Sequence, residues 1–253
     1  MVTSPGVGSP KTVVISQPMY FPWLGLFEQM RFANAFVHYD DVQFARGFYN
    51  RVQVKTPQGT TMLTVPLKDK HQGQKINESL ISYDTDWVSQ HRTTLISSYQ
   101  KAKHLDDAVA IFDHVTGRGH QMLSDLSRAS VMGIADYLGL VDKRDFFTSS
   151  DLAIAGTSSQ RLLEISEALG ARTYLTGLGA LHYLDHELFE AHNVDVRYMK
   201  YQIDPYQQVF PPFTPYVTAL DAIAHLGHSA IDVFNSSTLD WRSALERPSE
   251  LRP

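Results

Sequence analysis

The sequence predicts an α/β fold, with a Rossmann-like, mostly parallel sheet, flanking helices, an inserted β-hairpin and a helical subdomain. Three observations support this prediction. A short apolar run at residues 13–15 precedes a helical pattern and a second strand at residues 35–39. Residues 157–201 repeat a helix–strand–helix–strand order, which is typical of units that place helices against a parallel sheet. Between them, residues 48–82 alternate like a hairpin and residues 86–140 have helical spacing.

The first forty residues form a strand–loop–helix–strand unit. The loop is rich in proline and aromatic residues, and apolar residues then recur on one helical face at Trp23, Leu26, Phe27, Met30 and Ala33. Because a crossover between parallel strands is right-handed, we expect the two strands to lie in one sheet with the helix on its face.

The remaining elements follow from periodicity and from turn residues. Two alternating runs at 49–56 and 61–66 flank the turn Pro57-Gln58-Gly59, and residues 76–82 are expected to add a strand. Helices are predicted at residues 86–101, 104–115, 119–140, 157–170, 183–192 and 218–226. Further strands are predicted at residues 146–149, 173–176 and 194–201. Thr157-Ser-Ser-Gln160 has the form of a capping box.

The expected organisation is a single α/β domain over residues 12–228. Residues 1–11 are expected to be a disordered lead-in, and residues 229–253 a peripheral tail. Residues 1–10 lack the apolar core of a signal peptide, and no apolar run approaches the ~18 residues that a membrane span needs. We therefore expect a cytoplasmic protein without a membrane partner.

Composition narrows the chemistry. The 253 residues carry a formal charge of −5 without a long run of either sign, which argues against a nucleic-acid protein with a basic face. The chain has no cysteine, which excludes disulfides, thiolate metal sites and cysteine nucleophiles. His182 and His186 are four residues apart but lack an HExxH signature, so no metal site is predicted. Serine-hydrolase and P-loop motifs are also missing.

A polar loop follows the second strand. Asp40 and Asp41 could act as a general base or hold a cation, while Gln43 and Asn50 could orient a ligand through their amides. Arg51 has the planar fork that suits a phosphate or a carboxylate. The alternative is structural: Asp40 would cap the strand end, and Arg51 would lie on the hairpin surface.

The loop after the first strand is predicted to face the same edge of the sheet. Gln17, Tyr20 and Trp23 would line the crevice beyond the strand ends, where α/β proteins bind ligands. The aromatic rings would offer a face to a sugar or a base. Alternatively, Trp23 anchors the helix in the core.

Two further residues are candidates for the site. Gly177, between a strand and a helix, could expose backbone N–H groups to an anion, or it could simply form a tight turn. His71, in a lysine-rich loop, is a candidate for acid–base chemistry because an unperturbed histidine titrates near neutral pH. The alternative for His71 is a solvated loop.

Taken together, the two loops resemble the WbqC-like protein family. The residues that carry the resemblance are Gln17-Pro18-x-Tyr20-x-Pro22-Trp23-x-Gly25, Asp40-Asp41-Val42-Gln43-Phe44, Asn50-Arg51, Val65-Pro66, Tyr99, Gly177 and Tyr183-Leu184-Asp185. The resemblance spans residues 12–228 and adds Tyr183 to the expected substrate-binding residues. The chain departs from the pattern at residues 204–208, where a histidine is expected before the proline.

The resemblance implies a cytosolic bacterial protein of a surface-polysaccharide or natural-product pathway. It implies modification of an amino sugar or a similar metabolite by amide-forming acyl or aminoacyl transfer. A coenzyme A or carrier-protein thioester is the candidate donor, which would make an acyl or peptidyl carrier protein a candidate partner. No other cofactor is implied.

Three hypotheses follow. The first is a transferase in which Asp40, Asp41 or His71 takes the proton of an attacking amine, while Asn50 and Arg51 stabilise negative charge. The second is a nucleotide-dependent activating enzyme, since the order of elements also resembles pantothenate synthetase, although the histidine pair of its first loop is missing here. The third is a metabolite-binding protein without catalysis.

Overall fold

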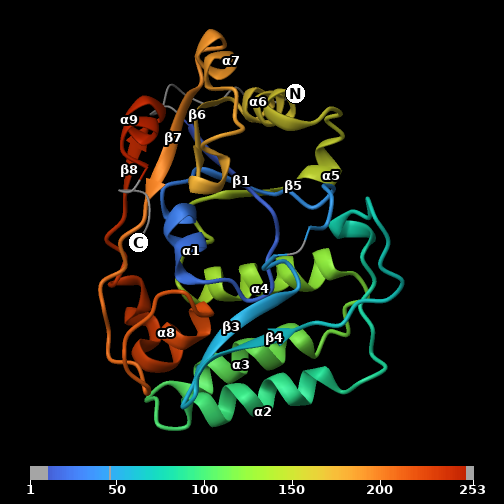
Figure 1. Cartoon of the computed structure of the whole chain (residues 1–253), viewed down its shortest axis with the longest axis vertical. Coiled ribbons are helices and arrows are strands. Elements are labelled where there is room, and N and C mark those ends of the chain that lie inside the picture. Colours follow the sequence, from blue (N-terminus) through green and yellow to red (C-terminus); the bar gives the residue numbers. More distant parts are fainter. Residues whose placement is uncertain (1–10, 46, 249–253) are drawn as a thin grey trace.

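A six-stranded, mostly parallel sheet forms the centre of the molecule, which confirms the predicted fold class (Figure 1). The computed structural model describes residues 11–45 and 47–248. The strands of the sheet, in spatial order, are β5 (Asp145–Thr148), β2 (Ala35–His38), β1 (Lys11–Ser16), β6 (Ala171–Thr176), β7 (Asp195–Lys200) and β8 (Ser237–Asp240). All neighbouring pairs are parallel except β7 and β8.

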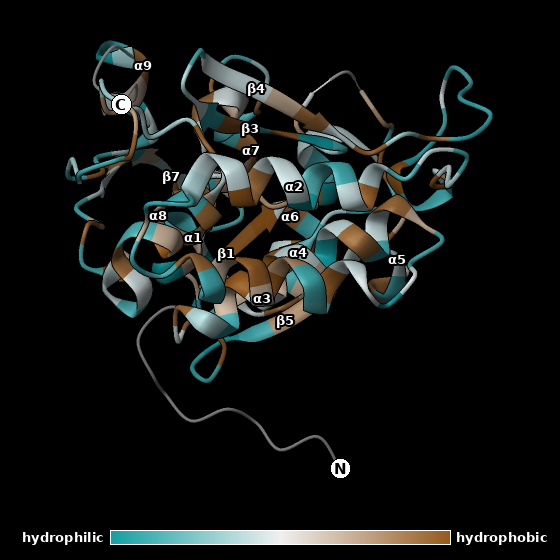
Figure 2. Ribbon diagram, turned by 90° about the horizontal axis from the view of Figure 1, so that it is seen from below, coloured by the Kyte–Doolittle hydropathy of each residue, from teal (hydrophilic) through white to brown (hydrophobic). Residues whose placement is uncertain are grey.

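The central strand β1 is buried on both faces of the sheet and is apolar along its inner residues (Figure 2). Successive side chains of a strand point to opposite faces. Val14 accordingly packs in one hydrophobic cluster, while Val13 and Ile15 pack in the other. The strand therefore joins the two halves of the core, and the loop that follows it starts from a rigid position.

Helices cover both faces of the sheet. The first face carries α1 (Leu24–Arg31), α4 (Leu123–Tyr137) and α8 (Ala219–Leu226). The opposite face carries α6 (Ser158–Ala168), α7 (His186–Ala191) and α9 (Trp241–Glu246). The short helix α5 (Ser149–Leu152) directly follows β5.

A further layer lies beyond α4 and α8. It contains the antiparallel hairpin of β3 (Arg51–Thr56) and β4 (Gly59–Thr64) with α2 (Trp87–Tyr99) and α3 (Leu105–Thr116) (Figure 1). The apolar side of the hairpin, with Val52 and Val54, belongs to the same cluster as α1 and α4. The insertion is thus packed onto the main core rather than separate from it.

The structure differs from the predicted elements in several places. Residues 76–82 do not form a strand: Ile76–Glu78 is a short 3-10 helix, because the Glu78 carboxylate accepts a hydrogen bond from the backbone N–H of Lys75 at 3.0 Å. The side chain of Thr157 makes no capping hydrogen bond at the start of α6. Within the expected peripheral tail, Ser237–Asp240 is the edge strand β8. The expected lead-in lies outside the described residues except for Lys11, as do residues 249–253.

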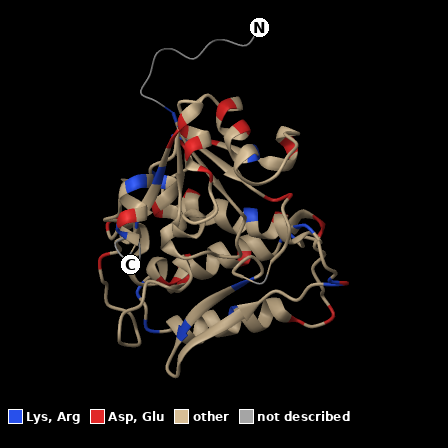
Figure 3. Ribbon diagram, turned by 45° about the horizontal axis from the view of Figure 1, so that its top comes forward, with Lys and Arg blue, Asp and Glu red and all other residues tan. Residues whose placement is uncertain are grey.

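Lysine and arginine residues are spread over several elements, and acidic residues are frequent near α6 and α7 (Figure 3). Among the residues that the structure describes, none of the helices combines the length and the apolar composition that a bilayer crossing requires.

Candidate functional site

The sheet has a switch point between β1 and β6. The chain leaves β1 toward β2 through α1, and it leaves β6 toward β7 through α7, on the opposite face of the sheet. In open α/β sheets, ligands bind at the carboxyl ends of the strands at such a point. A hollow of about 660 Å³ lies there, and both Gln17 after β1 and Gly177 after β6 line it. We call it the switch pocket.

The polar lining of the switch pocket consists of hydroxyl and amide groups. These groups belong to Ser16, Gln17, Gln29, Tyr39, Tyr174, Thr176, Tyr183 and Tyr201. No lysine, arginine, histidine or carboxylate is among the described residues that line it. An apolar side, which includes Met19, Trp23 and Phe48, completes the wall. The pocket therefore offers many neutral donors and acceptors next to an aromatic face.

The tyrosines of the pocket remain protonated. Burial raises the pKa of Tyr39, Tyr174 and Tyr183, and for Tyr39 the nearby Arg161 only partly offsets this effect. Burial also raises the pKa of Tyr49, whose hydroxyl pairs with the side chain of Gln17. At neutral pH these hydroxyls can thus donate as well as accept hydrogen bonds.

The loop after β1 is held by the hairpin and by α4. The backbone N–H of Tyr20 donates to the Tyr49 carbonyl at 3.1 Å, and that of Phe21 donates to Ser130 Oγ at 2.9 Å. Phe21 has a φ of 41°, a left-handed conformation that costs a bulky residue energy and persists where the surroundings enforce it.

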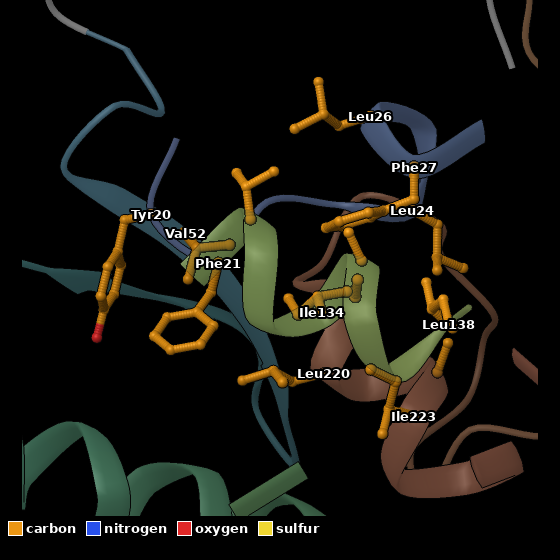
Figure 4. Packing of buried hydrophobic residues seen from close by; sticks show 14 of the residues in the cluster. Tyr20, Phe21, Leu24, Leu26, Phe27, Val52, Ile134, Leu138, Leu220 and Ile223 are labelled. Carbon is orange, nitrogen blue, oxygen red and sulfur yellow. The ribbon is translucent and has the colours of Figure 1, made fainter. Parts of the chain in front are cut away.

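Tyr20 does not contact the switch pocket. Its side chain is fully buried among core residues near Val52 (Figure 4), and its hydroxyl lies 3.0 Å from Nδ1 of His91. The prediction that Tyr20 presents its ring to a substrate is therefore corrected. The left-handed turn at Phe21 directs the side chains of Tyr20 and Phe21 into the core. Burial in the core, which is the alternative stated above for Trp23, therefore applies to Tyr20.

Trp23 does line the switch pocket, and Gly25 makes its position possible. The indole packs against Tyr201 and Tyr216, with ring centroids 5.0 and 5.8 Å away. A Cβ atom at Gly25 would lie 2.2 Å from Cζ2 of Trp23. The spacing Trp23-x-Gly25 thus has a physical reason, because the ring lies across the first turn of α1.

Replacing Gly25 with alanine is expected to destabilise the protein by about 1–3 kcal/mol, because the new methyl group overpacks the indole. Alanine at an open helical position would instead stabilise by up to about 1 kcal/mol, so the sign of the effect is diagnostic. Urea unfolding measures this change in the free energy of unfolding. Gly179→Ala, where an added Cβ meets no atom within 4 Å, is the matched control. A stabilised Gly25→Ala protein would contradict the packing argument.

The two aspartates after β2 are engaged with α5 and α6. Asp40 is buried and accepts hydrogen bonds from the backbone N–H and Oγ of Ser150, at 3.2 and 3.0 Å, while its own backbone N–H donates to Oγ of Ser149 at 3.1 Å. Asp41 accepts from Ser149 Oγ at 2.6 Å and forms an ion pair with Arg161. Burial opposes ionisation of Asp41, but the bonds from Arg161 and Ser149 outweigh it and lower its pKa.

Arg161 connects this ion pair to the switch pocket. Its guanidinium carbon lies 5.1 Å from the ring centroid of Tyr39, and Nε donates to the Ile154 carbonyl at 2.9 Å. Tyr39 precedes Asp41 by two residues in the chain and lines the pocket. Asp41 is therefore linked to the wall of the pocket through Arg161 and Tyr39.

The other predicted residues of the polar loops lie away from the switch pocket. Asn50 is buried and donates to the Val65 carbonyl at 2.8 Å, which closes the base of the hairpin. Gln43 is exposed and bridges to Lys75 through the backbone. His71 is exposed, with Nδ1 3.3 Å from the Asp69 carbonyl. Arg51 donates to the Gly47 carbonyl at 2.9 Å and lines an adjacent hollow.

The structure brings four of the predicted residues together around the switch pocket: Gln17, Trp23, Gly177 and Tyr183. It also reveals residues in or beside the pocket that the sequence analysis missed. Tyr39 and Thr176 lie at the ends of predicted strands, so the strand-end rule could have found them. Tyr174, inside β6, and Arg161, on α6, carry no local signal of this kind.

Comparison with known proteins places the chain in a family. The description "WbqC-like protein family" matches residues 17–233. The chain belongs to the WbqC-like protein family. The match contains every lining residue of the switch pocket except Ile15 and Ser16. The WbqC-like chain is also 32% identical over 226 residues to the "Uncharacterized protein Rv1507c" of Mycobacterium tuberculosis, covering 88% of this chain and 96% of that protein. No solved structure matches the chain.

Proposed function

We propose that this WbqC-like protein is a biosynthetic transferase that forms an amide by acyl or aminoacyl transfer to an amine. The acceptor, an amino sugar or a similar hydroxyl-rich amine, would bind in the switch pocket. The lining of that pocket by neutral hydroxyl and amide groups beside an aromatic face is the observation that carries the proposal.

The match between pocket and ligand is chemical. A sugar presents several hydroxyl groups that both donate and accept, and it has an apolar face that packs on aromatic rings. Gln17, Tyr174 and Tyr183 supply the polar partners, and Trp23 supplies the ring. A nucleotide-activating reaction would need cations beside the phosphates. Among the described residues, the lining of the switch pocket contains no lysine or arginine, and the adjoining hollow contains Arg51.

The transfer balances with a thioester donor. The amine nitrogen attacks the thioester carbonyl, the new C–N bond forms, and the C–S bond breaks. The amine proton passes to the departing thiolate, so the products are an amide and a thiol. Hydroxyl donors of the pocket would stabilise the oxyanion that develops on the carbonyl. In this proposal Asp41 is a positioning residue, which holds Tyr39 through Arg161.

A thiol-release assay tests the proposed transfer, and the absence of cysteine from the chain makes its readout specific. Because the chain has none, any thiol that appears in a mixture of the protein, an amino sugar and an acyl-coenzyme A comes from the donor. We expect amine-dependent thiol release and an amide product in mass spectrometry. Gln17→Leu should lower kcat/KM about ten-fold, the equivalent of one lost hydrogen bond of about 1.4 kcal/mol.

Gln90→Leu, at an exposed position of α2, is the matched control and should leave kcat/KM unchanged. Binding of the amino sugar without thiol release from any donor would overturn the transferase and favour a metabolite-binding protein. ATP-dependent pyrophosphate exchange would instead favour the activating enzyme. Equal losses of kcat/KM in Gln17→Leu and Gln90→Leu would show that the switch pocket takes no part in the reaction.

A further inference from the structure

A second hollow of about 270 Å³ adjoins the switch pocket, and we call it the apolar pocket. The two share Met19, Trp23 and Phe48 in their walls, so a ligand in one lies beside a ligand in the other. The apolar pocket is lined otherwise mostly by carbon, with Pro22, Val52 and Val217 among its residues. Its character is the opposite of the hydroxyl-lined switch pocket.

The walls of the apolar pocket are fixed by backbone hydrogen bonds. Thr218 N–H donates to the Gln53 carbonyl at 2.9 Å, and Ala219 N–H donates to the Pro22 carbonyl at 2.8 Å. Trp23 and Thr218 also form a β-bridge. Three segments that are far apart in the chain, the loop after β1, the hairpin and residues 216–219, are thereby tied together. A pocket with such walls loses little entropy when a ligand binds.

Among the described residues that line the apolar pocket, Arg51 is the charged one, and Gln53 and Tyr216 add polar groups to a wall that is mostly apolar. Its Nε donates to the Gly47 carbonyl, and no described residue accepts a hydrogen bond from its terminal nitrogens, which can therefore bind another group. No carboxylate among the described residues forms an ion pair with it. The pocket therefore combines a site for an apolar group with a cation at its wall.

We propose that the apolar pocket binds the acyl chain of the donor, and that Arg51 binds the phosphate of its phosphopantetheine arm. This inference rests on the proposed transferase and adds the substrate class. A cavity of about 150 Å³ holds benzene, so 270 Å³ suits an acyl group of medium length or an aromatic one better than acetyl. The thioester carbonyl would lie near Trp23, where the two pockets meet.

The shared chemistry of the two donor sources, coenzyme A and a carrier protein, is the phosphopantetheine thioester. Unreactive thioether probes test it without turnover: S-hexyl-phosphopantetheine, S-methyl-phosphopantetheine, S-hexyl-pantetheine and S-hexyl-coenzyme A. Calorimetry should give S-hexyl-phosphopantetheine at least about ten-fold tighter binding than the methyl compound, since each buried methylene strengthens binding several-fold. Equal affinity of these two would overturn the proposal.

Two variants test the binding of the acyl chain and the binding of the phosphate separately. Gln53→Trp, which fills the apolar pocket from β3, should abolish the preference for the hexyl group, whereas Thr61→Trp on the opposite face of the hairpin should keep it. Arg51→Met should weaken S-hexyl-phosphopantetheine about ten-fold and leave S-hexyl-pantetheine, which has no phosphate, unchanged. Because the second comparison uses one folded variant with two ligands, misfolding cannot imitate it; equal losses for both ligands would refute the role of Arg51.

The outcomes also separate the two proposals. Chain-length preference in binding without amine-dependent thiol release would sustain the apolar pocket and overturn the transferase. Amine-dependent thiol release that does not change with Gln53→Trp or with chain length would support the transferase and overturn the role of the apolar pocket. Tighter binding of S-hexyl-coenzyme A than of S-hexyl-phosphopantetheine would identify coenzyme A as the source, and equal binding would identify a carrier protein.

Discussion

Replacing Arg161 with methionine is expected to lower the free energy of unfolding by about 3 kcal/mol, because it leaves the Asp41 carboxylate in the interior without its cation. The two side chains of this ion pair are 7% and 18% exposed, so water replaces the lost partner poorly. Removing one member of a buried pair costs much more than the pair itself contributes. Equilibrium unfolding in urea measures the loss.

An exposed ion pair provides the control. Arg92 and Asp113 lie 2.8 Å apart with side chains 45% and 41% exposed, and Arg92→Met should leave the free energy of unfolding nearly unchanged, because water solvates both charges. The double variant Arg161→Met with Asp41→Leu should recover most of the lost stability, since an apolar pair replaces both charges. No recovery in the double variant would show that the two residues stabilise the protein independently.

The same ion pair bears on the assignment of a catalytic base. A carboxylate whose pKa is lowered is ionised well below neutral pH and has little tendency to take a proton from an amine. Because the pKa of Asp41 is lower in the folded state than in the unfolded state, its carboxylate stabilises the protein above the unfolded-state pKa. This contribution is lost as the pH falls through the folded-state pKa. Loss of turnover in Asp41→Asn is therefore expected to come with loss of stability.

A fall from pH 7 to pH 5 is expected to destabilise the protein by about 2 kcal/mol for each of two buried histidines, His38 and His91. Burial, with a further contribution from Arg128, lowers the pKa of His38 to about 4, and burial lowers that of His91 to about 4. Both have an ordinary value near 6.5 when unfolded. The unfolded state therefore takes up protons first as the pH falls, so stability decreases between about pH 6.5 and pH 4.

His38 allows a direct test. Its ring is 2% exposed, has no hydrogen-bond partner among the described residues, and lies against Phe36 and Phe146 with centroids 5.2 and 6.3 Å away. His38→Phe should make the loss of stability between pH 7 and pH 5, measured by urea unfolding, smaller by about 2 kcal/mol. His71→Phe, at an exposed loop position, should leave the slope intact. An unchanged slope in His38→Phe would mean that His38 is not the titrating group.

The strands and helices could be predicted from the sequence because their signals are local. The apolar runs of β1, β2 and β6, the alternation of β7 and the helical spacing of α2, α3 and α4 depend on residues close together in the chain. Where a local contact competed, the prediction was wrong: the Glu78 carboxylate holds residues 76–78 in a 3-10 helix instead of the predicted strand.

The position of the switch pocket could be predicted from the sequence, but the residues that line it could be predicted only in part. The rule that ligands bind beyond the carboxyl ends of parallel strands located Gln17 and Gly177 correctly at one pocket. It could not distinguish Trp23, which lines that pocket, from Tyr20, which is buried three residues earlier. The difference depends on the left-handed turn at Phe21, which contacts with Ser130, more than a hundred residues away, help to hold.

The sequence by itself determined the α/β class, the order of most elements and the sheet edge at which the switch pocket lies, because these depend on periodicity and on strand ends. Only the tertiary structure decided which groups line that pocket. The pairing of Asp41 with Arg161, the gathering of Tyr39, Tyr174 and Tyr183, and the apolar pocket beside them all join segments distant in the chain. Such contacts depend on packing, which leaves no regular spacing in the sequence to read.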